Sequence, residues 1–202
     1  GSHLMDLATD DEEYRNKSIV ETQRVIDITR SLKSFFPNEK RPIIVANIGG
    51  FSMDEPFDEE KKTRYYNQFF ESLKLLDLEG VELIPQTMAP FPWHFGGQRY
   101  QNIFVLPEEI AHYCSENKLR MCLDVSHSML TCNHLGLDFY DFVSKVAPFM
   151  SHLHLGDAKG VNGEGLQINE GEINFVRLSE ILKKECPNAS FIPEIWQGHK
   201  ND

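Results

Sequence analysis

Short apolar runs alternate with amphipathic stretches along almost the whole chain. The apolar runs are short enough to be buried strands, and the stretches between them carry apolar residues at approximately helical spacing. Strict alternation of this kind predicts parallel strands joined by right-handed crossovers, and therefore an α/β fold. The expected strands are residues 42–48, 81–85, 119–125, 151–155 and 191–195, and the expected helices are residues 11–36, 58–78, 107–117, 137–146 and 175–184.

A closed barrel fits this alternation better than an open, doubly wound sheet. Open sheets often bind ligands through a GxGxxG turn that opens a helix, and the sequence contains no such turn. A parallel (β/α) barrel of the TIM type needs eight strands, whereas the pattern predicts about five. We therefore expect an incomplete barrel of about five βα units. Its unpaired edges would favour self-association or contact with missing parts of a longer chain.

We expect a single domain that spans residues 6–202. Its composition disfavours some classes of binding partner. Residues 1–5 read GSHLM, which is typical of a cleaved affinity tag, so they are left out of the fold prediction. The formal net charge of -11 would repel a nucleic acid, and no apolar stretch approaches the roughly 18 residues that a membrane span needs. The four cysteines form no CxxC pair. They indicate buried thiols in a soluble, cytoplasmic protein.

Polar residues stand at the ends of four successive predicted strands. Barrel enzymes place the residues that contact ligand at this edge, where the carboxyl ends of parallel strands meet. His127 lies just beyond one of these strands, at the mouth of the predicted barrel. His152 precedes one of the strand-end residues by two positions, and we expect it to face the other way in a supporting role. The four strand-end residues are Gln86, Asp124, His154 and Glu194.

Four longer motifs surround these positions. They are LDVSH at residues 123–127, HLHLGD at 152–157, GEGLQINEGEINF at 163–175 and PEIWQGH at 193–199. Each motif alone is weak, but together they resemble the xylose isomerase-like TIM barrels, a family that includes sugar isomerases, ketose epimerases and endonuclease IV. The resemblance covers nearly all of the chain from residue 15 onward and implies strands four to eight of the barrel.

This resemblance implies a divalent cation held by one residue from each of the last four strands. Matched position by position, the ligands are Gln86, Asp124, His154 and Glu194. Oxygen and imidazole ligands suit a cation such as Mn²⁺, Mg²⁺, Co²⁺ or Zn²⁺. The implied reaction moves a proton at a carbon next to a carbonyl group, through a metal-stabilised enediolate. In this scheme Glu194 is both a ligand and the catalytic base.

Gln86 departs from the pattern of the family's epimerases, in which a glutamate at this position is the second acid or base. An amide oxygen can coordinate a cation, but an amide cannot accept and return a proton. Either the reaction needs only one carboxylate base, with Gln86 still part of the catalytic site, or the domain has lost turnover. Glu82 stands four positions earlier, which places it deeper along the strand than a substitute would need.

The segment of residues 87–100 is rich in proline, glycine and aromatic residues and is predicted to be a loop, in which residues 90–100 resemble a lid over the site. Its aromatic rings could cover the apolar face of a sugar, and its basic side chains could hold a hydroxyl, carboxylate or phosphate group. Packing of the same rings on the barrel rim is the alternative. The predicted substrate contacts are Trp93, His94 and Arg99 from the lid, together with His127 and Asp157, for which a local ion pair is the alternative.

Three functions from different classes remain open. The first is a metal-dependent isomerase or epimerase that acts on a small sugar or sugar phosphate. The second is a catalytically silent carbohydrate-binding or assembly domain of a larger carbohydrate-biosynthesis protein, which Gln86 and the missing strands favour. The third is an endonuclease IV-like nuclease, which the acidic charge of the chain disfavours.

Overall fold

Five short parallel strands form the centre of the structure, a computed structural model that describes residues 4–94, 97–196 and 198. For residues 93, 94, 97 and 98 the description is limited to the backbone. The strands coincide with the five predicted segments to within one or two residues at their starts. They are β1 (Ile43–Ala46), β3 (Glu82–Pro85), β7 (Met121–Asp124), β8 (Met150–Leu155) and β11 (Ser190–Pro193).

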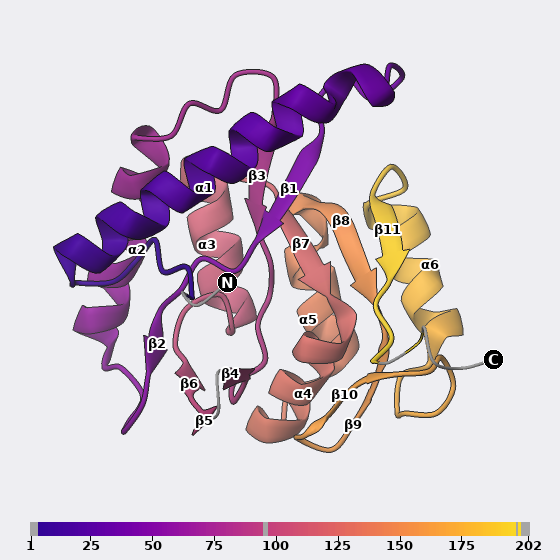
Figure 1. The fold of residues 1–202 in the computed structure, drawn as a ribbon. Helices are drawn as coiled ribbons and strands as arrows, with labels where there is room; N and C mark the ends of the chain where they lie inside the picture. The colour runs from indigo at the N-terminus through magenta and orange to yellow at the C-terminus, as the bar shows by residue number, and fades with distance from the viewer. Residues whose placement is uncertain (1–3, 95–96, 197, 199–202) are drawn as a thin grey trace.

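The five strands run in the same direction across the centre of Figure 1, and their pairings give the order in which they follow one another along the chain. β1 pairs with β3, and β8 lies between β7 and β11, with every pairing parallel. A parallel bridge between Gln86 and Cys122 joins β3 to β7. This is the wall of a TIM-type barrel. The wall stays open, because among the described residues β1 and β11 each pair along one side only. The predicted α/β fold with an incomplete barrel is confirmed.

Helices follow the strands, as the predicted alternation requires, and α3 and α5 lie behind the wall in Figure 1. Aspartate or asparagine side chains accept backbone N–H groups at the first turns of α1, α2, α5 and α6, so they fix where these helices begin. Two 3₁₀ turns cover Lys33–Phe35 and Ala147–Phe149. The helices are α1 (Glu12–Leu32), α2 (Glu59–Lys74), α3 (Pro107–Asn117), α4 (Val125–Leu135), α5 (Phe139–Val146) and α6 (Phe175–Glu185).

Helix α4 occupies a segment for which no helix is predicted from the sequence. Strand β7 ends at Asp124, and the helix begins at the next residue without a loop. Asp124 fixes this start, because its carboxylate accepts the N–H of His127 at 2.9 Å. Polar residues such as Ser128 and Thr131 are buried on this helix. Burial on several sides explains why its sequence lacks a clear amphipathic period.

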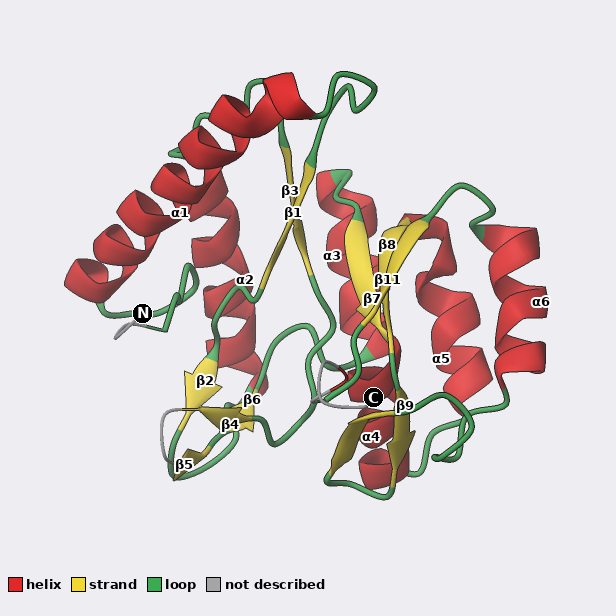
Figure 2. Cartoon of the chain, turned by 45° about the vertical axis from the view of Figure 1, so that its right-hand side comes forward, coloured by secondary structure: helices red, strands yellow, loops and turns green. Residues whose placement is uncertain are grey.

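Smaller strands gather at the end of the wall toward which the parallel strands point (Figures 1 and 2). They form three antiparallel pairs that belong to the connections after β1, β3 and β8. These connections therefore surround the edge where barrels of this type bind their ligands. The pairs are β2 (Phe51–Ser52) with β6 (Tyr100–Gln101), β4 (Trp93–His94) with β5 (Gly97–Gln98), and β9 (Asp157–Lys159) with β10 (Gly163–Leu166).

A buried tyrosine ties α2 to the connection that precedes α3. Tyr66 is 1% exposed, and its hydroxyl accepts the N–H of Phe104 at 2.8 Å and donates to Glu109 at 3.1 Å. Phe104 is fully buried at a φ of 58°, a left-handed conformation that costs a residue other than glycine about 1–3 kcal/mol. The hydrogen bond and the surrounding rings hold this conformation in place, so the connection has one fixed path toward the mouth of the wall.

Apolar side chains are exposed at the open end of the wall and along α1. All four residues of β11 are exposed, and the Phe191 side chain retains 61% of its accessible surface. On the other side, Val20, Ile28 and Leu32 of α1 are exposed. Exposed apolar surface of this kind marks places where another protein segment packs. Self-association, or contact with further parts of a longer chain, remains a prediction, and the exposed surfaces of β11 and α1 are where we expect it.

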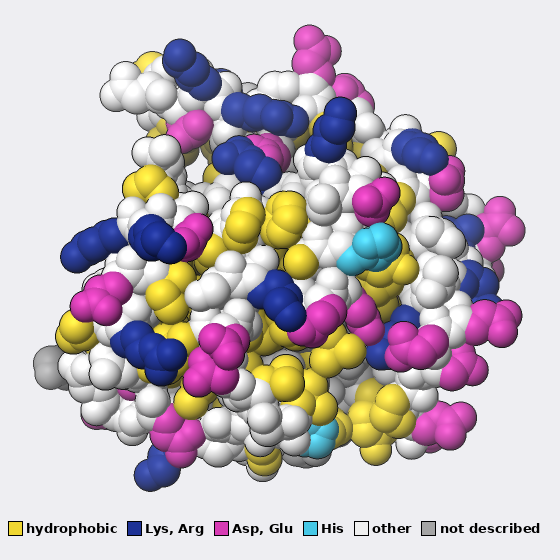
Figure 3. Space-filling view, turned by 180° about the vertical axis from the view of Figure 1, so that it is seen from behind, with side chains coloured by type: hydrophobic (Ala, Val, Ile, Leu, Met, Phe, Trp, Pro, Cys, Tyr) yellow, Lys and Arg dark blue, Asp and Glu magenta, His cyan; other side chains and the backbone are white. Residues whose placement is uncertain are grey.

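Charged side chains of both signs are interspersed on the face shown in Figure 3. In the described part of the chain, no helix has the length and apolar character of a membrane span.

All four cysteines are free thiols. Burial raises the pKa values of Cys114 and Cys132 to about 12, which keeps both thiols protonated and unreactive at neutral pH.

A buried carboxylate fastens the amino-terminal segment to the end of β1. Asp6 is 7% exposed and accepts the N–H groups of Ala8 at 3.0 Å and Gly50 at 3.2 Å. Gly49 adopts a φ of 94°, and a Cβ atom there would lie 2.0 Å from Asp6 Oδ1, so only glycine fits. Burial raises the pKa of Asp6 to about 6, although the backbone N–H donors oppose this shift.

This pKa predicts a specific dependence of stability on pH. The folded state binds the Asp6 proton more tightly than the unfolded state, so its stabilising effect is complete below about pH 4 and is lost as the pH rises to about 6. Between pH 4 and pH 6 this should lower the free energy of unfolding by about 2 kcal/mol, because the folded-state carboxyl is only half deprotonated at pH 6. Urea titrations of the wild type and Asp6→Asn at pH 4 and pH 6 test this: the wild-type loss should exceed that of the variant by this amount, and equal losses contradict it.

Candidate metal centre

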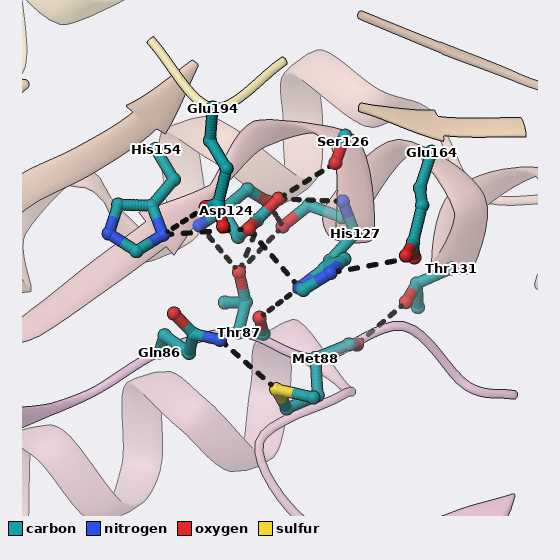
Figure 4. A network of polar contacts seen from close by, with 11 residues as sticks. Gln86, Thr87, Met88, Asp124, Ser126, His127, Thr131, His154, Glu164 and Glu194 are labelled. Atoms are coloured by element: carbon teal, nitrogen blue, oxygen red, sulfur yellow. Dashed lines mark hydrogen bonds and ion pairs between the residues drawn. The ribbon is translucent and has the colours of Figure 1, made fainter. Parts of the chain in front are cut away.

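Three side chains predicted as metal ligands converge at the carboxyl ends of β7, β8 and β11 (Figure 4). Asp124 ends β7 and stands opposite His154 of β8 in the parallel register. Glu194 directly follows β11, and its N–H donates to Leu155 O at 2.8 Å, which continues the ladder by one residue. One carboxylate or imidazole atom from each of the three residues lies within 4.8 Å of the other two. This separation fits one cation bound to all three.

The imidazole of His154 gives the clearest indication of a cation. Its Nδ1 atom lies 2.6 Å from Glu194 Oε2 and 3.7 Å from Asp124 Oδ2. Despite these short distances, Nδ1 is buried and makes no hydrogen bond of acceptable geometry with any residue that the structure describes. Buried polar atoms are normally satisfied. A nitrogen that faces two carboxylate oxygens without a hydrogen bond fits a ligand whose partner is a metal ion between the three groups.

The electrostatics of the cluster also favour a positive charge. Burial alone disfavours the charged form of His154, but contacts with Asp124, Cys122 and Glu194 outweigh burial and raise its pKa to about 12. Burial likewise disfavours the charged form of Asp124, yet the charge of His127 and the hydrogen bonds that the carboxylate accepts hold its pKa below the ordinary value. Two carboxylates at the same strand-end edge, that of Asp124 buried and that of Glu194 exposed, stabilise either a proton or a cation between them.

The two oxygens of Asp124 have different tasks. Oδ1 accepts the N–H of His127 at 2.9 Å and the hydroxyl of Ser126 at 3.0 Å, both from the first turn of α4. Oδ2 faces the imidazole nitrogens of His154 and His127 at 3.7 and 3.3 Å. The backbone N–H of Asp124 donates to Thr87 Oγ1 at 2.9 Å. These contacts orient the carboxylate so that one oxygen caps the helix and the other points at the cluster.

Gln86 lies at the end of β3, next to this cluster (Figure 4). Its amide nitrogen donates to Met88 Sδ at 3.5 Å, so the nitrogen is turned toward the methionine. Coordination by the amide oxygen and a part in catalysis stay predictions. Glu82 is paired with Arg120 through both carboxylate oxygens and stands opposite Ile43, at the start of the wall. It lies at the far end of the strand from the cluster and does not replace a carboxylate at position 86.

The expectation that His152 faces away from His154 is wrong. Their ring centroids are 5.4 Å apart, and both residues stand opposite residues of β7 on the same face of the wall. The physical reason is the two-residue period of a strand, which returns side chains two positions apart to the same face. His152 Nδ1 lies 2.7 Å from Ser190 Oγ of β11. The residue thus braces the neighbouring strand below the cluster.

The residues predicted to contact substrate lie in different parts of the structure. His127 is only 16% exposed and lies beside the cluster. Arg99 lines a cleft of about 460 Å³ together with Phe91 and Val161, and its Nε atom is buried without a hydrogen-bond partner among the described residues. Trp93 and His94 form β4, but their side chains lie outside the described part of the structure. Contact of all four with a substrate stays a prediction.

Asp157 has a clear structural task. It is fully buried, and its two oxygens accept four backbone N–H groups, at 2.8 to 3.1 Å. These donors come from the long connection between β8 and α6, so the carboxylate folds this connection around itself. No lone pair is evidently left for a sugar, and the predicted contact with substrate gains no support from this placement. The donors are Ala158, Asn169, Gly171 and Ile173.

Two residues at the site are absent from the prediction. Thr87 is fully buried and links β3 to Asp124, but a single threonine in a loop carries no sequence signal for this role. Glu164 of β10 places its Oε2 atom 3.6 Å from His127 Nε2. Its signal was present in the sequence, because a carboxylate between Gly163 and Gly165 is a charged group on a tightly turned backbone at the mouth of a barrel.

The sequence matches the family model described as "Xylose isomerase-like TIM barrel" over residues 1–202. The chain belongs to this family. No curated protein matches the sequence. The family that the four sequence motifs resemble is therefore confirmed.

Solved structures of sugar epimerases share the fold of this xylose isomerase-like chain. A D-tagatose 3-epimerase-like protein superposes with a TM-score of 0.67 at 19% identity, over 95% of this chain and 66% of its own. An L-ribulose 3-epimerase gives 0.70 at 14% identity, over 98% and 61%. A D-psicose 3-epimerase, solved in the presence of D-fructose, gives 0.67 at 16% identity, over 96% and 62%. The chain thus spans less than two thirds of the length of these relatives.

The link between Thr87 and Asp124 yields a test of how the cluster is positioned. Thr87→Val keeps the shape of the side chain but leaves the buried Asp124 N–H without its acceptor. We expect a loss of about 2 kcal/mol in the free energy of unfolding, measured by urea titration. Thr63→Val on the surface of α2 is the control, with a change within about 0.5 kcal/mol. Equal effects of the two substitutions contradict the role of Thr87.

Proposed function

We propose that the chain is the metal-binding part of a sugar or sugar-phosphate isomerase or epimerase. The observation that carries this proposal is the convergence of Asp124, His154 and Glu194 at the mouth of a parallel wall, around a buried imidazole nitrogen that has no hydrogen bond within the described part of the chain. The similarity of fold to ketose 3-epimerases supports the class of substrate.

The three ligands divide the chemistry between them. Mn²⁺, Mg²⁺, Co²⁺ or Zn²⁺ would be held by Asp124, His154 and Glu194, with Gln86 as a proposed fourth ligand. Such a cation stabilises negative charge that develops on oxygens next to the reacting carbon. The Glu194 side chain is 58% exposed, so substrate can reach its carboxylate. We assign to Glu194 the removal of the proton from the carbon next to the carbonyl.

Gln86 favours a second candidate, a carbohydrate-binding or assembly domain without turnover. An amide cannot return a proton to the opposite face of the substrate, as epimerisation by two carboxylates requires. A chain that spans less than two thirds of its relatives' length is also compatible with a part that acts only within a larger protein. A nuclease related to endonuclease IV is disfavoured, because a net charge of -11 repels a phosphate backbone.

The setting of the protein is also proposed. Free, buried thiols suit a reducing compartment, for which we propose the cytoplasm. The exposed apolar residues of β11 and α1 suit contact with a second copy or with a further part of a longer polypeptide. The small substrate that we propose is a free sugar or its phosphate, and Arg99 offers a cation for the latter.

Metal titration tests the ligand set directly. We expect the wild type to bind one Mn²⁺ per chain in isothermal titration calorimetry, and His154→Gln or Glu194→Gln to weaken binding at least about 100-fold. His112→Gln changes an exposed histidine of α3 and serves as the matched control. Wild-type affinity in the His154 and Glu194 variants, or an equal loss in the control, contradicts the assignment.

Restoring the missing carboxylate distinguishes the two candidate functions. Gln86→Glu supplies a second acid or base from β3, so a decayed epimerase should gain turnover of D-fructose to D-psicose, followed by chromatography with Mn²⁺ present. Turnover already present in the wild type would show that one carboxylate suffices. Turnover in neither protein, with Mn²⁺ bound by both, favours the binding or assembly domain.

A further inference from the structure

The cleft that Arg99 lines lies at the same end of the wall as the candidate metal centre. It has a volume of about 460 Å³ and is formed where the connections after β1, β3 and β8 meet. The small strands of these connections stand at the end toward which the parallel strands point (Figure 2). One border of the cleft is the β9–β10 hairpin, whose Glu164 contacts His127 beside the centre. The lining residues are Met53, Phe91, Arg99, Tyr100, Val161 and Asn162.

Arg99 differs from the other arginines, because its side chain makes no hydrogen bond or ion pair with any residue that the structure describes. Its Nε atom is buried there without an acceptor. The other arginines each face a carboxylate or a backbone carbonyl oxygen, as Arg64 faces Asp10 at 2.9 Å. The chain has a formal net charge of -11, so carboxylates are abundant elsewhere. The guanidinium group of Arg99 is therefore available for an anion that comes from outside.

The backbone on both sides of Arg99 is fixed. The N–H of Arg99 donates to Pro92 O at 3.2 Å. The N–H of Gln101 donates to Pro90 O at 3.0 Å. Tyr100, between them, belongs to β6, which pairs with β2. The side chain of Arg99 thus starts from a defined point of the connection, so little freedom of the backbone is lost when a ligand binds.

The other polar groups of the cleft can also donate hydrogen bonds. Tyr100 offers a hydroxyl group and Asn162 a side-chain amide, and none of the described residues that line the cleft is acidic. A guanidinium group binds two oxygens of a phosphate at once, and a phosphate keeps a further oxygen for a neighbouring donor. A carboxylate has only two oxygens, both of which the guanidinium group would occupy. The set of donors therefore suits a phosphate group.

This cleft and the metal centre lie at one mouth, so one substrate can contact both. Resting on the proposed function, we propose that the substrate is a ketose phosphate, with its phosphate group bound by Arg99 in the cleft. The carbonyl end of the same molecule is then held at the metal centre. The rings of Phe91 and Tyr100, with centroids 5.5 Å apart, give the cleft an apolar wall for the carbon chain between the two ends. Arg99 is thus a specificity-determining residue.

Comparison of a phosphorylated sugar with the free sugar tests the cleft. We expect the Mn²⁺-loaded wild type to bind D-fructose 6-phosphate about ten- to a hundredfold more tightly than D-fructose, because charge-assisted hydrogen bonds are gained. Arg99→Gln should bind the two sugars equally, and Arg99→Lys should keep a smaller preference, since an ammonium group has the charge without the planar fork. Arg24→Gln, which changes an exposed arginine of α1, is the matched control and should keep the wild-type preference. NMR titration measures the sugar affinities, and calorimetry measures Mn²⁺ binding.

The outcomes separate the cleft from the metal centre. If the wild type binds Mn²⁺ but does not prefer the phosphorylated sugar, the phosphate site is overturned and the metal centre stands. A preference that Arg99→Gln retains also overturns it, because the phosphate would then be bound elsewhere, for example at the cation. Tighter binding of D-glucuronate than of D-fructose 6-phosphate would assign the cleft to a carboxylate and overturn the phosphate. If the wild type does not bind Mn²⁺, the proposed function fails and the ketose phosphate fails with it.

Discussion

The parallel register of β7, β8 and β11 is the constraint on which the site depends. Asp124 stands opposite His154, and Glu194 extends the ladder beside Leu155, so the three side chains reach the same edge at the same height. A shift of one residue in any pairing would turn one ligand to the opposite face of the wall. The apolar residues between the ligands, such as Leu123 and Leu153, are buried and hold this register. Packing of the core therefore fixes the strand register, and the register brings the three side chains of the site together.

Asp124 connects the fold to the chemistry. One oxygen begins α4 by accepting the N–H of His127, and this capping also brings the His127 ring beside the carboxylate. The other oxygen is left for the cluster. Helix formation, orientation of the ligand and placement of a histidine at the mouth thus follow from one side chain. Because Asp124 both ends β7 and caps α4, the strand passes into the helix without a loop. Few sequence patterns would indicate such a direct transition.

Charged and polar groups are distributed unevenly around the site. The side from β7 to β11 has two carboxylates and an imidazole, with His127 and Glu164 beside them, whereas β3 contributes an amide at Gln86. On that side the connections after β1 and β3 offer aromatic rings and the guanidinium of Arg99, whose buried Nε has no partner among the residues that the structure describes. Charge that a substrate brings would therefore be met by the proposed cation on one side of the mouth and by Arg99 on the other. The exposed Phe191 marks where the wall would continue if another segment paired with β11.

The sequence alone was enough to predict the alternation of elements, the five strands and the three residues of the cluster, because hydrophobic period and strand ends are local properties. It was not enough for α4, whose buried Ser128 and Thr131 obscure the helical period, or for the direction of His152, which was misjudged against the two-residue period of a strand. The contacts of Thr87 and Glu164 became visible only in three dimensions, although the two glycines that flank Glu164 were a signal in the sequence. Thr87 contacts Asp124, which lies 37 residues further along the chain. Glu164 contacts His127, which belongs to a different connection. Contacts of this kind are set by how connections fold across the mouth of the wall, and no local pattern of residue types records them.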